Sequence, residues 1–501
     1  MQALMNTTES TNLSHLIDSR VFRMVGETAD ELSRPCYVVG GYVRDLIIGR
    51  HSKDIDFVTV GAGIEVAQAV TKRLGRSSHI SVFRNFGTAQ VKHKDLELEF
   101  VGARRESYDR NSRKPVVEDG TLDDDLARRD FTINAMAICV NGNNFGQLVD
   151  KYDGLGDIRR RIIRTPLDPD ITFSDDPLRM MRAIRFATQL QFEIYPETLD
   201  AISRNAGRIS IISRERIADE LNKIMLSPVP SIGWKLLNST GLLELIFPQL
   251  AALRGVDRKG ERAHKDNFCH TLTVLDNVAE VSDNLWLRWA ALLHDIGKPV
   301  VKHYDSRTGW TFHNHDFVGS RMIPDIFRSL RLPLNEKMKY VRKLVELHMR
   351  PISLVEDIVT DSAVRRLANY AEEDLSDLMI LARADITSRN EDKKARFLRN
   401  FDIVEAKFRD IDAKDRERNR KAIIRGDEIM HIFGLSQCPT VGVFIKRLLQ
   451  AQRDDEIEPT REAALDFIYT LAGELGVEPV NAPFEITEPT VSQEDNINKQ
   501  Q

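Results

Sequence analysis

The sequence predicts an α+β protein with a mixed α/β region first and a mostly helical region after it. Between Pro35 and about Asp153, short apolar runs alternate with glycine-marked turns, which is typical of a small domain of strands and helices. From Ser174 onward, apolar residues recur every three or four positions, as they do on helices with one buried face. With 501 residues and 42% hydrophobic content, the chain is long enough for several packed units.

Composition limits the partners and the compartment. The net charge of -5 excludes a polycation that coats nucleic acid, so RNA binding requires local basic surfaces. The N-terminus lacks a basic stretch followed by an apolar core, and no apolar run of about 18 residues occurs, so neither secretion nor membrane insertion is expected. The cysteines form no CxxC pair, which argues against a zinc site or disulfides and favours a reducing cytoplasm. They are Cys36, Cys139, Cys269 and Cys438.

The segment YVVGGYVRDLIIGRHSKDIDFVTV combines a glycine pair with a pair of aspartates. An apolar strand runs into Gly40 and Gly41, a helical segment carries Arg44, and a second strand carries Asp54 and Asp56. Carboxylates at i and i+2 project from one face of a strand, and such close like charges favour a bound cation, of which Mg²⁺ is the obvious one. Glycine lets backbone N–H groups approach a triphosphate, and an arginine can hold a phosphate oxygen. These parts predict a site for a nucleoside triphosphate.

The spacing GGxVRDxxxGRxxxDxD resembles the signature of the class II tRNA nucleotidyltransferase and bacterial poly(A) polymerase superfamily. A DxD pair alone is a weak signal, because solvated strand ends often carry it, whereas the full spacing is specific. The resemblance implies a head with the polymerase-β nucleotidyltransferase fold, in which Asp54 and Asp56 bind catalytic Mg²⁺.

A third carboxylate joins the aspartate pair in this family. In RNFGTAQVKHKDLELEFVGARRESY, the acids Asp95, Glu97 and Glu99 alternate with apolar residues, so periodicity cannot choose among them. Resemblance to the family's following strands favours Glu99, with Glu97 as the alternative. A polar strand face without a catalytic role is the other interpretation.

The segment DLARRDFTINAMA resembles the family's motif B, which contacts the phosphates and ribose of the nucleotide. The polar, acidic stretch between Glu106 and Asp125 is expected to be a mobile loop. In CCA-adding relatives a flexible loop at this place is needed for the switch to ATP, so it favours a complete CCA enzyme over a CC-only one. KYDGLGDIRRRIIR resembles motif C, a hinge. The nucleotide-binding residues that motif B implies are Arg128, Arg129, Asp130 and Asn134.

The segment FSDDPLRMMRAIRFATQL places polar residues at successive i, i+3 positions, which predicts one stripe of a helix. They are Asp176, Arg179, Arg182 and Arg185. Such a stripe is more often a solvated or salt-bridged surface. Cytosine and adenine, however, both present an exocyclic amine beside a ring-nitrogen acceptor, so an aspartate and an arginine together can accept both bases and reject uracil and guanine.

The same segment resembles the family's motif D, EDxxR. The resemblance implies that Asp176 and Arg179 read the base and that Arg182 and Arg185 lie near the nucleotide. Asp175 departs from the family's usual glutamate, which puts the supporting role of that first acid in doubt. ISRERIADELNKIM resembles motif E, which braces this helix.

A second set of metal-binding residue types lies in the helical half. An adjacent His-Asp that closes an apolar helix and precedes Gly-Lys-Pro resembles the HD phosphohydrolase superfamily, with ligands H…HD…D. The resemblance implies a divalent transition metal, since imidazole and carboxylate suit manganese, nickel, iron or zinc better than magnesium. It also implies phosphatase or 2′,3′-cyclic phosphodiesterase activity, against the alternative of an inactive helical domain. The four ligands are His270, His294, Asp295 and Asp385, and the extra histidines of two-metal members match His315 and His348.

The expected organisation follows these motifs. A nucleotidyltransferase head spans 15–160, a helical neck and body that binds RNA and nucleobase 161–260, an HD domain 261–392, a helical tRNA-binding tail 393–477, and a disordered tail 478–501. The expected function is untemplated addition of CTP and ATP to the tRNA 3′ end in the cytoplasm. The alternatives are a bacterial poly(A) polymerase and a metal-dependent phosphohydrolase with a degenerate, RNA-binding head.

Overall fold

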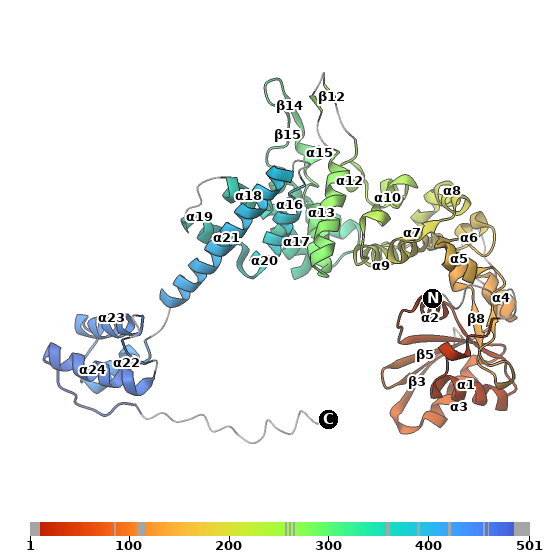
Figure 1. Cartoon of the computed structure of the whole chain (residues 1–501), viewed down its shortest axis with the longest axis horizontal. Coiled ribbons are helices and arrows are strands. Elements are labelled where there is room, and N and C mark those ends of the chain that lie inside the picture. The colour runs from red at the N-terminus through yellow and green to blue at the C-terminus, as the bar shows by residue number, and fades with distance from the viewer. Residues whose placement is uncertain are drawn as a thin grey trace. The chain divides into compact units, whose positions relative to one another are not determined.

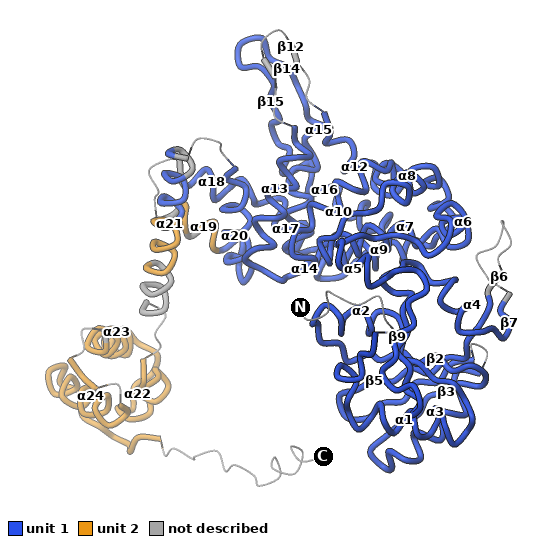
Figure 2. Tube along the Cα trace, turned by 45° about the vertical axis from the view of Figure 1, so that its right-hand side comes forward, with its two compact units in different colours: residues 1–357, 369–401 blue, residues 358–368, 402–501 orange. Residues whose placement is uncertain are grey.

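The structure is a computed structural model, and it divides into two compact units (Figures 1 and 2). One unit comprises residues 1–357 and 369–401, and the other comprises residues 358–368 and 402–501. The predicted α+β class is confirmed, with the strands concentrated in the N-terminal part. The described residues are 11–84, 87–107, 116–255, 258–259, 262–263, 266–356, 361–387, 391–418, 422–453, 456–458 and 460–484.

A seven-stranded sheet in the order β3-β4-β5-β2-β1-β8-β9 forms the base of the head. Only β2 and β5 of this sheet run parallel, and their inner face carries Phe57 and Phe100, which stack at 4.9 Å between ring centroids. Helix α3 packs against β4 and β5. The strands are β1 (Cys36–Val39), β2 (Asp54–Thr59), β3 (Ser78–Phe83), β4 (Thr88–His93), β5 (Leu96–Gly102), β8 (Ala137–Cys139) and β9 (Leu148–Val149), and the first helices are α1 (Arg20–Glu31), α2 (Gly41–Ile48) and α3 (Gly63–Leu74).

The acidic stretch 106–125 is more ordered than the sequence suggests. Strand β6 (Arg104–Ser107) pairs with β7 (Val116–Asp119), and α4 (Leu122–Ala127) follows, so the expectation of one mobile loop is wrong for residues 116–125. A capping box closes the start of α4, where Thr121 and Asp124 exchange hydrogen bonds. Residues 108–115 lie outside the described residues. The head continues through η5 (Thr132–Asn134) and α5 (Gly154–Arg160).

The neck and body are helical, as predicted, but Asp176 does not lie on the helix that carries the three arginines. Helix α6 (Pro169–Asp175) ends just before it, and α7 (Leu178–Leu190) begins after Pro177. Because proline disfavours helical geometry at the preceding residue, Asp176 is extended, with φ −132° and ψ 96°. The helices that follow are α8 (Pro196–Asn205), α9 (Arg214–Met225), α10 (Ser231–Ser239), α11 (Leu242–Ile246) and α12 (Pro248–Ala251).

The next region is a helical bundle that also carries two small hairpins, which the sequence pattern did not predict. The hairpins are β12 (Arg258–Lys259) with β13 (Arg262–Ala263) and β14 (His303–Asp305) with β15 (Gly309–Thr311). The helices are α13 (Asn267–Val281), α14 (Leu285–Leu293), α15 (Lys298–Val301), α16 (His315–Ser329), α17 (Glu336–Leu347), α18 (Met349–Glu356), α19 (Asp361–Ala371) and α20 (Leu375–Ala384).

The C-terminal unit has its own core, in which Phe433 and Phe444 stack at 5.0 Å between centroids. The tail expected to be disordered is ordered at its start, because the N–H groups of Val480 and Asn481 donate to the carbonyl of Ile432. The remainder, 485–501, lies outside the described residues. In the described part of the chain, every helix is too short or too polar to cross a membrane. The last helices are α21 (Glu391–Arg418), α22 (Gly426–Ile432), α23 (Pro439–Arg453) and α24 (Arg461–Leu475).

Helices α9 and α14 are fastened together by Arg288. Its side chain is only 2% exposed, and Nη1 donates to the carbonyls of Met225, the last residue of α9, and of Ser227, two residues further on. On α14, Arg288 Nε also donates to the carbonyl of Ser282, and the neighbouring Trp289 donates to Asn222 on α9. These contacts use backbone carbonyls at a helix end that otherwise lack partners.

We expect Arg288→Met to lower the free energy of unfolding by about 3 kcal/mol, because it leaves buried carbonyls without donors. Thermal unfolding followed by circular dichroism measures the shift. Arg328→Met is the matched control, since Arg328 is exposed and pairs only with exposed Asp325. Equal transition temperatures for the two variants would contradict the role of Arg288.

Candidate active sites

Three carboxylates meet at the centre of the head sheet. The parallel register places Asp56 opposite Glu99 and Asp54 opposite Glu97. Glu97 is engaged elsewhere, with Lys92 Nζ at 2.7 Å and Gln90 Nε2 at 2.9 Å. The geometry therefore brings Glu99 beside the aspartate pair.

The carboxylates of Asp56 and Glu99 both have raised pKa values, although Arg129 lowers the first and Arg104 the second. Burial away from solvent is the main cause that raises the pKa of Asp56. The positive charge of Arg129 lowers this pKa, and the negative charge of Asp54 raises it. The pKa of Glu99 is raised by partial burial and then by the charge of Asp56. A raised pKa in both groups marks a place where a divalent cation with oxygen ligands would be favoured.

Gly40 forms the floor of the site. Its φ is +75°, which favours glycine, and a Cβ there would lie 2.8 Å from Arg129 Nη1 and 3.5 Å from Asp56 Oδ2. Arg129 therefore lies directly over the glycine turn and beside the carboxylates. Gly41 begins α2, and a Cβ at this position would lie 3.4 Å from Arg44 Nη2.

A chain of hydrogen bonds joins three of the elements that the motifs predicted. Arg44 Nη1 donates to Asn134 Oδ1 at 2.8 Å, and Asn134 Nδ2 donates to Asp130 Oδ1 at 3.0 Å. The other oxygen of Asp130 accepts from Arg182 Nε on α7 at 2.7 Å. Burial opposes the charge on Asp130, but the charge and hydrogen bonds of Arg182, the hydrogen bond from Asn134 and the charge of Arg179 together outweigh burial and lower the pKa of Asp130 to about 2. These four residues form one connected cluster.

The remaining motif D residues divide into two groups. Arg179 Nη2 donates to the backbone carbonyl of Arg128 at 2.8 Å, so Arg179 lies beside motif B. Asp176 Oδ2 lies 3.6 Å from Arg216 Nη2, so Asp176 lies beside α9. Arg185 differs, because it is buried and hydrogen-bonds to Glu220 of α9. Its guanidinium braces α7 against α9, as motif E is expected to do.

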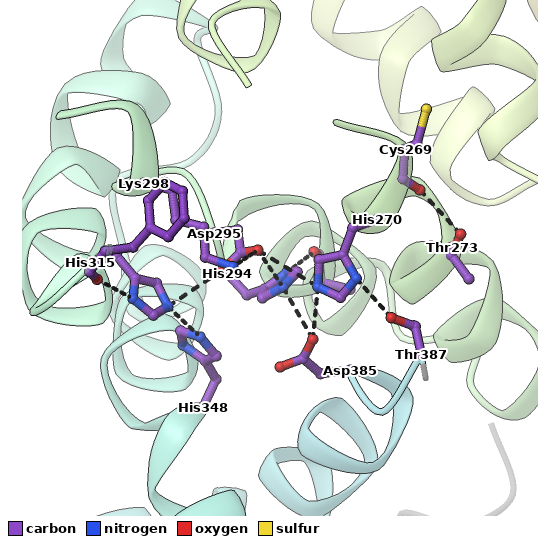
Figure 3. Close-up of polar contacts among 12 residues, drawn as sticks. Cys269, His270, Thr273, His294, Asp295, Lys298, His315, His348, Asp385 and Thr387 are labelled. Atoms are coloured by element: carbon purple, nitrogen blue, oxygen red, sulfur yellow. Dashed lines mark hydrogen bonds and ion pairs between the residues drawn. The ribbon is translucent and has the colours of Figure 1, made fainter. Parts of the chain in front are cut away.

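In the helical half, all six predicted HD residues come together (Figure 3). Two groups of three potential ligands each lie within 4.8 Å. The first contains His270, His294 and Asp385, and the second contains Asp295, His315 and His348.

Backbone carbonyls orient three of these histidines. Nδ1 of His294, His315 and His348 lies 2.8, 2.9 and 2.7 Å from the carbonyls of Ala291, Phe312 and Val345. Because a carbonyl only accepts, each Nδ1 carries a proton, which leaves Nε2 as the ring atom that can bind a metal ion. Metal-binding imidazoles are usually oriented by such a hydrogen bond from the ring nitrogen that does not bind the metal.

The histidine Nε2 atoms and the carboxylates that face one another in this site need a positive charge between them. The Nε2 atoms of His315 and His348 lie 3.3 Å apart, and His294 Nε2 is buried without a hydrogen-bond partner among the described residues. Burial opposes a charge on His294, yet the carboxylates of Asp295 and Asp385 outweigh it and raise the pKa of His294 to about 10. A proton or a metal ion can supply this charge, and imidazole with carboxylate suits a divalent transition metal.

Sequence reasoning missed two residues that hold the head site together. Glu220 anchors Arg185, and Asp125 accepts from both Arg128 and Arg129. Both lie inside segments that resemble motifs, but the neighbouring acids Asp123, Asp124 and Asp219 look the same in sequence. Burial alone distinguishes them, and the sequence pattern did not reveal it.

The fold and the head site define a nucleotidyltransferase, and comparison with known proteins agrees. Residues 36–164 match the poly A polymerase head domain, residues 191–253 match the probable RNA and SrmB-binding site of polymerase A, and residues 267–390 match the HD domain.

Relatives of known name cover most of the chain. The A-adding tRNA nucleotidyltransferase of Deinococcus radiodurans is 32% identical over 85% of this chain and 93% of its own. The CC-adding tRNA nucleotidyltransferase of Thermus thermophilus is 29% identical over 88% of this chain and 94% of its own. The multifunctional CCA protein of Vibrio parahaemolyticus is 30% identical over 70% of this chain and 85% of its own. The chain belongs to the tRNA nucleotidyltransferase family.

Solved structures share the fold. A tRNA nucleotidyltransferase complexed with a primer tRNA and an incoming ATP analog superposes with a TM-score of 0.52, at 25% identity over 76% of this chain and 98% of that one. The Thermotoga maritima CCA-adding enzyme complexed with tRNA superposes with a TM-score of 0.56, at 21% identity over 93% of this chain and 100% of that one.

Proposed function

We propose that the protein adds CTP and ATP to the tRNA 3′ end and builds the complete CCA sequence in the cytoplasm. The cluster of Asp54, Asp56 and Glu99 beside the Gly40 turn supports this most directly. The RNA 3′-oxygen forms a bond to the α-phosphorus while the bond to the β-phosphate breaks and pyrophosphate leaves. Asp54 and Asp56 would hold Mg²⁺, which when bound would activate the hydroxyl and stabilise the charge on the leaving group.

The chain's own residues bind the other parts of the nucleotide in this proposal. Arg129 contacts the triphosphate from its place over Gly40, Gly41 offers its backbone N–H, and Arg128 and Arg44 support the phosphate side. Asp130 and Asn134 hold the ribose side. The hydrogen bonds from Arg44 to Asn134 and from Asn134 to Asp130 hold these three side chains in place before the nucleotide binds.

We expect Asp54→Ala and Asp56→Ala each to abolish CTP addition to tRNA that lacks its CCA end, because each removes an oxygen ligand from the site. Incorporation of labelled CTP measures the effect, and circular dichroism checks the fold. Asp95→Ala, an exposed acid in the turn before β5, should retain activity. Near-normal incorporation by either site variant would remove the carboxylate pair from catalysis.

Base choice is assigned to Asp176 and Arg179. The aspartate accepts from the exocyclic amine of cytosine or adenine, and the arginine donates to the adjacent ring nitrogen. Asp176 precedes α7 rather than lying on it, and Arg179 is tied to the motif B carbonyl, so both can face a nucleotide held by motif B. Arg182 acts through Asp130, and Arg185 acts only as a brace.

The variant Asp176→Ala should raise UTP and GTP incorporation relative to CTP and ATP by roughly tenfold to a hundredfold, because it removes about 1 to 3 kcal/mol of discrimination. Competition between labelled nucleotides measures the ratio. Asp170→Ala, an exposed acid on α6 that pairs with Arg204, serves as the control. Unchanged selectivity in Asp176→Ala would exclude this residue from the template.

A second activity is favoured by the converging histidines and aspartates of the HD region. His270, His294, Asp295 and Asp385 would hold a divalent transition metal, and His315 and His348 would complete a second position. Such a metal when bound would supply an activated water for attack on a phosphoester. We propose that this site hydrolyses phosphomonoesters or 2′,3′-cyclic phosphates at RNA ends.

We expect His294→Ala to abolish Mn²⁺- or Ni²⁺-dependent phosphohydrolase activity and to leave CTP addition unchanged, since the ligands of the two sites lie in different domains. Hydrolysis of a 2′,3′-cyclic nucleotide measures the first activity. His303→Ala, exposed on β14, is the matched control. If the unmodified protein hydrolyses no phosphoester with any of these metals, the HD region is structural.

A further inference from the structure

Helix α4 begins with three consecutive aspartates that have three different surroundings. Asp123 is exposed and pairs with Lys151 Nζ at 2.6 Å. Asp124 closes the capping box with Thr121. Asp125 is fully buried, although a buried carboxylate is costly unless it is paired.

Asp125 is paired with both arginines of motif B. Its Oδ1 accepts from Arg128 Nε at 3.0 Å and also from Arg128 Nη2. Its Oδ2 accepts from Arg129 Nε at 3.1 Å and from Arg129 Nη2 at 2.8 Å. One carboxylate therefore holds one edge of each of two guanidinium groups.

The bidentate bond to Asp125 decides which edge of Arg129 faces the site. Nε and Nη2 are used by Asp125, and the remaining nitrogen, Nη1, is the atom that lies over Gly40. That position is next to the Asp56 carboxylate. A free arginine side chain would sample several rotamers, and fixing one of them on binding would weaken the binding of the nucleotide.

We propose that Asp125 is a positioning residue that fixes Arg129, so that its Nη1 edge meets the triphosphate of any incoming nucleotide. The inference rests on the proposed nucleotide addition. Because the triphosphate is common to all four nucleotides, Asp125 strengthens their binding equally and takes no part in base choice. Asp176 differs in this respect, since its proposed effect is on selectivity.

The test compares Asp125→Asn with Asp123→Asn, which makes the same change of charge at an exposed neighbouring position. An asparagine cannot accept both guanidinium edges, because its amide nitrogen is a donor. We expect Asp125→Asn to raise KM about tenfold for CTP, ATP, UTP and GTP alike, and to weaken inhibition by pyrophosphate by the same factor. The KM for tRNA and the ratio of correct to incorrect nucleotide should not change.

A second variant covers the case in which Asp125→Asn does not fold. Arg129→Lys keeps the positive charge but cannot make the two-nitrogen bond to Asp125, so it should show the same uniform rise in KM. Equilibrium dialysis of labelled ATP with Mg²⁺ gives the same comparison without turnover. Where Asp125→Asn folds, its effect and that of Arg129→Lys should not add in the double variant, because both remove one interaction.

The outcomes separate the two proposals. If the unmodified protein adds no nucleotide to tRNA, the proposed function is wrong. If it is active and Asp125→Asn matches Asp123→Asn, the positioning role is wrong. A folded Arg129→Lys that binds ATP as the unmodified protein does, or a loss of base selectivity in Asp125→Asn, would also overturn it.

Discussion

The ion pair between buried Asp130 and partly exposed Arg182 connects the part of the site that would hold the triphosphate to the part that would read the base. Arg182 lies on α7, one turn from Arg179, while Asp130 continues through Asn134 to Arg44 on α2. Glu220 braces the other side of α7 through Arg185. Selection of a base by a protein surface requires that this surface keep a constant distance from the phosphates, and the ion pair supplies that constraint.

The sequence predicted the fold class and most of the site, because the motifs are local. A glycine pair, a DxD strand and a His-Asp helix end each lie within a few residues, so their spacing is visible in one segment. The choice of Glu99 over Glu97 was different, since it depends on the parallel pairing of β2 with β5, which are separated by two other strands. Periodicity could not supply that register.

The errors have physical reasons of the same kind. The i, i+3 spacing predicts that Asp176 lies on a helix, but the spacing takes no account of Pro177, which ends the helical geometry before α7. Its polarity predicts a loop at the acidic stretch around α4, but Asp124 caps the helix and Asp125 forms ion pairs with Arg128 and Arg129. Polar composition indicates exposure on average, and a paired carboxylate is the exception.

The relatives differ in what they add, since their names include A-adding, CC-adding and CCA activities. Three tRNA substrates, ending before CCA, after the first C, and after the second C, distinguish these activities when each is incubated with CTP and ATP and the product lengths are measured. We expect all three to be completed to CCA and growth then to stop. Addition of the two C residues alone, of the final A alone, or of a long A tail would contradict this expectation.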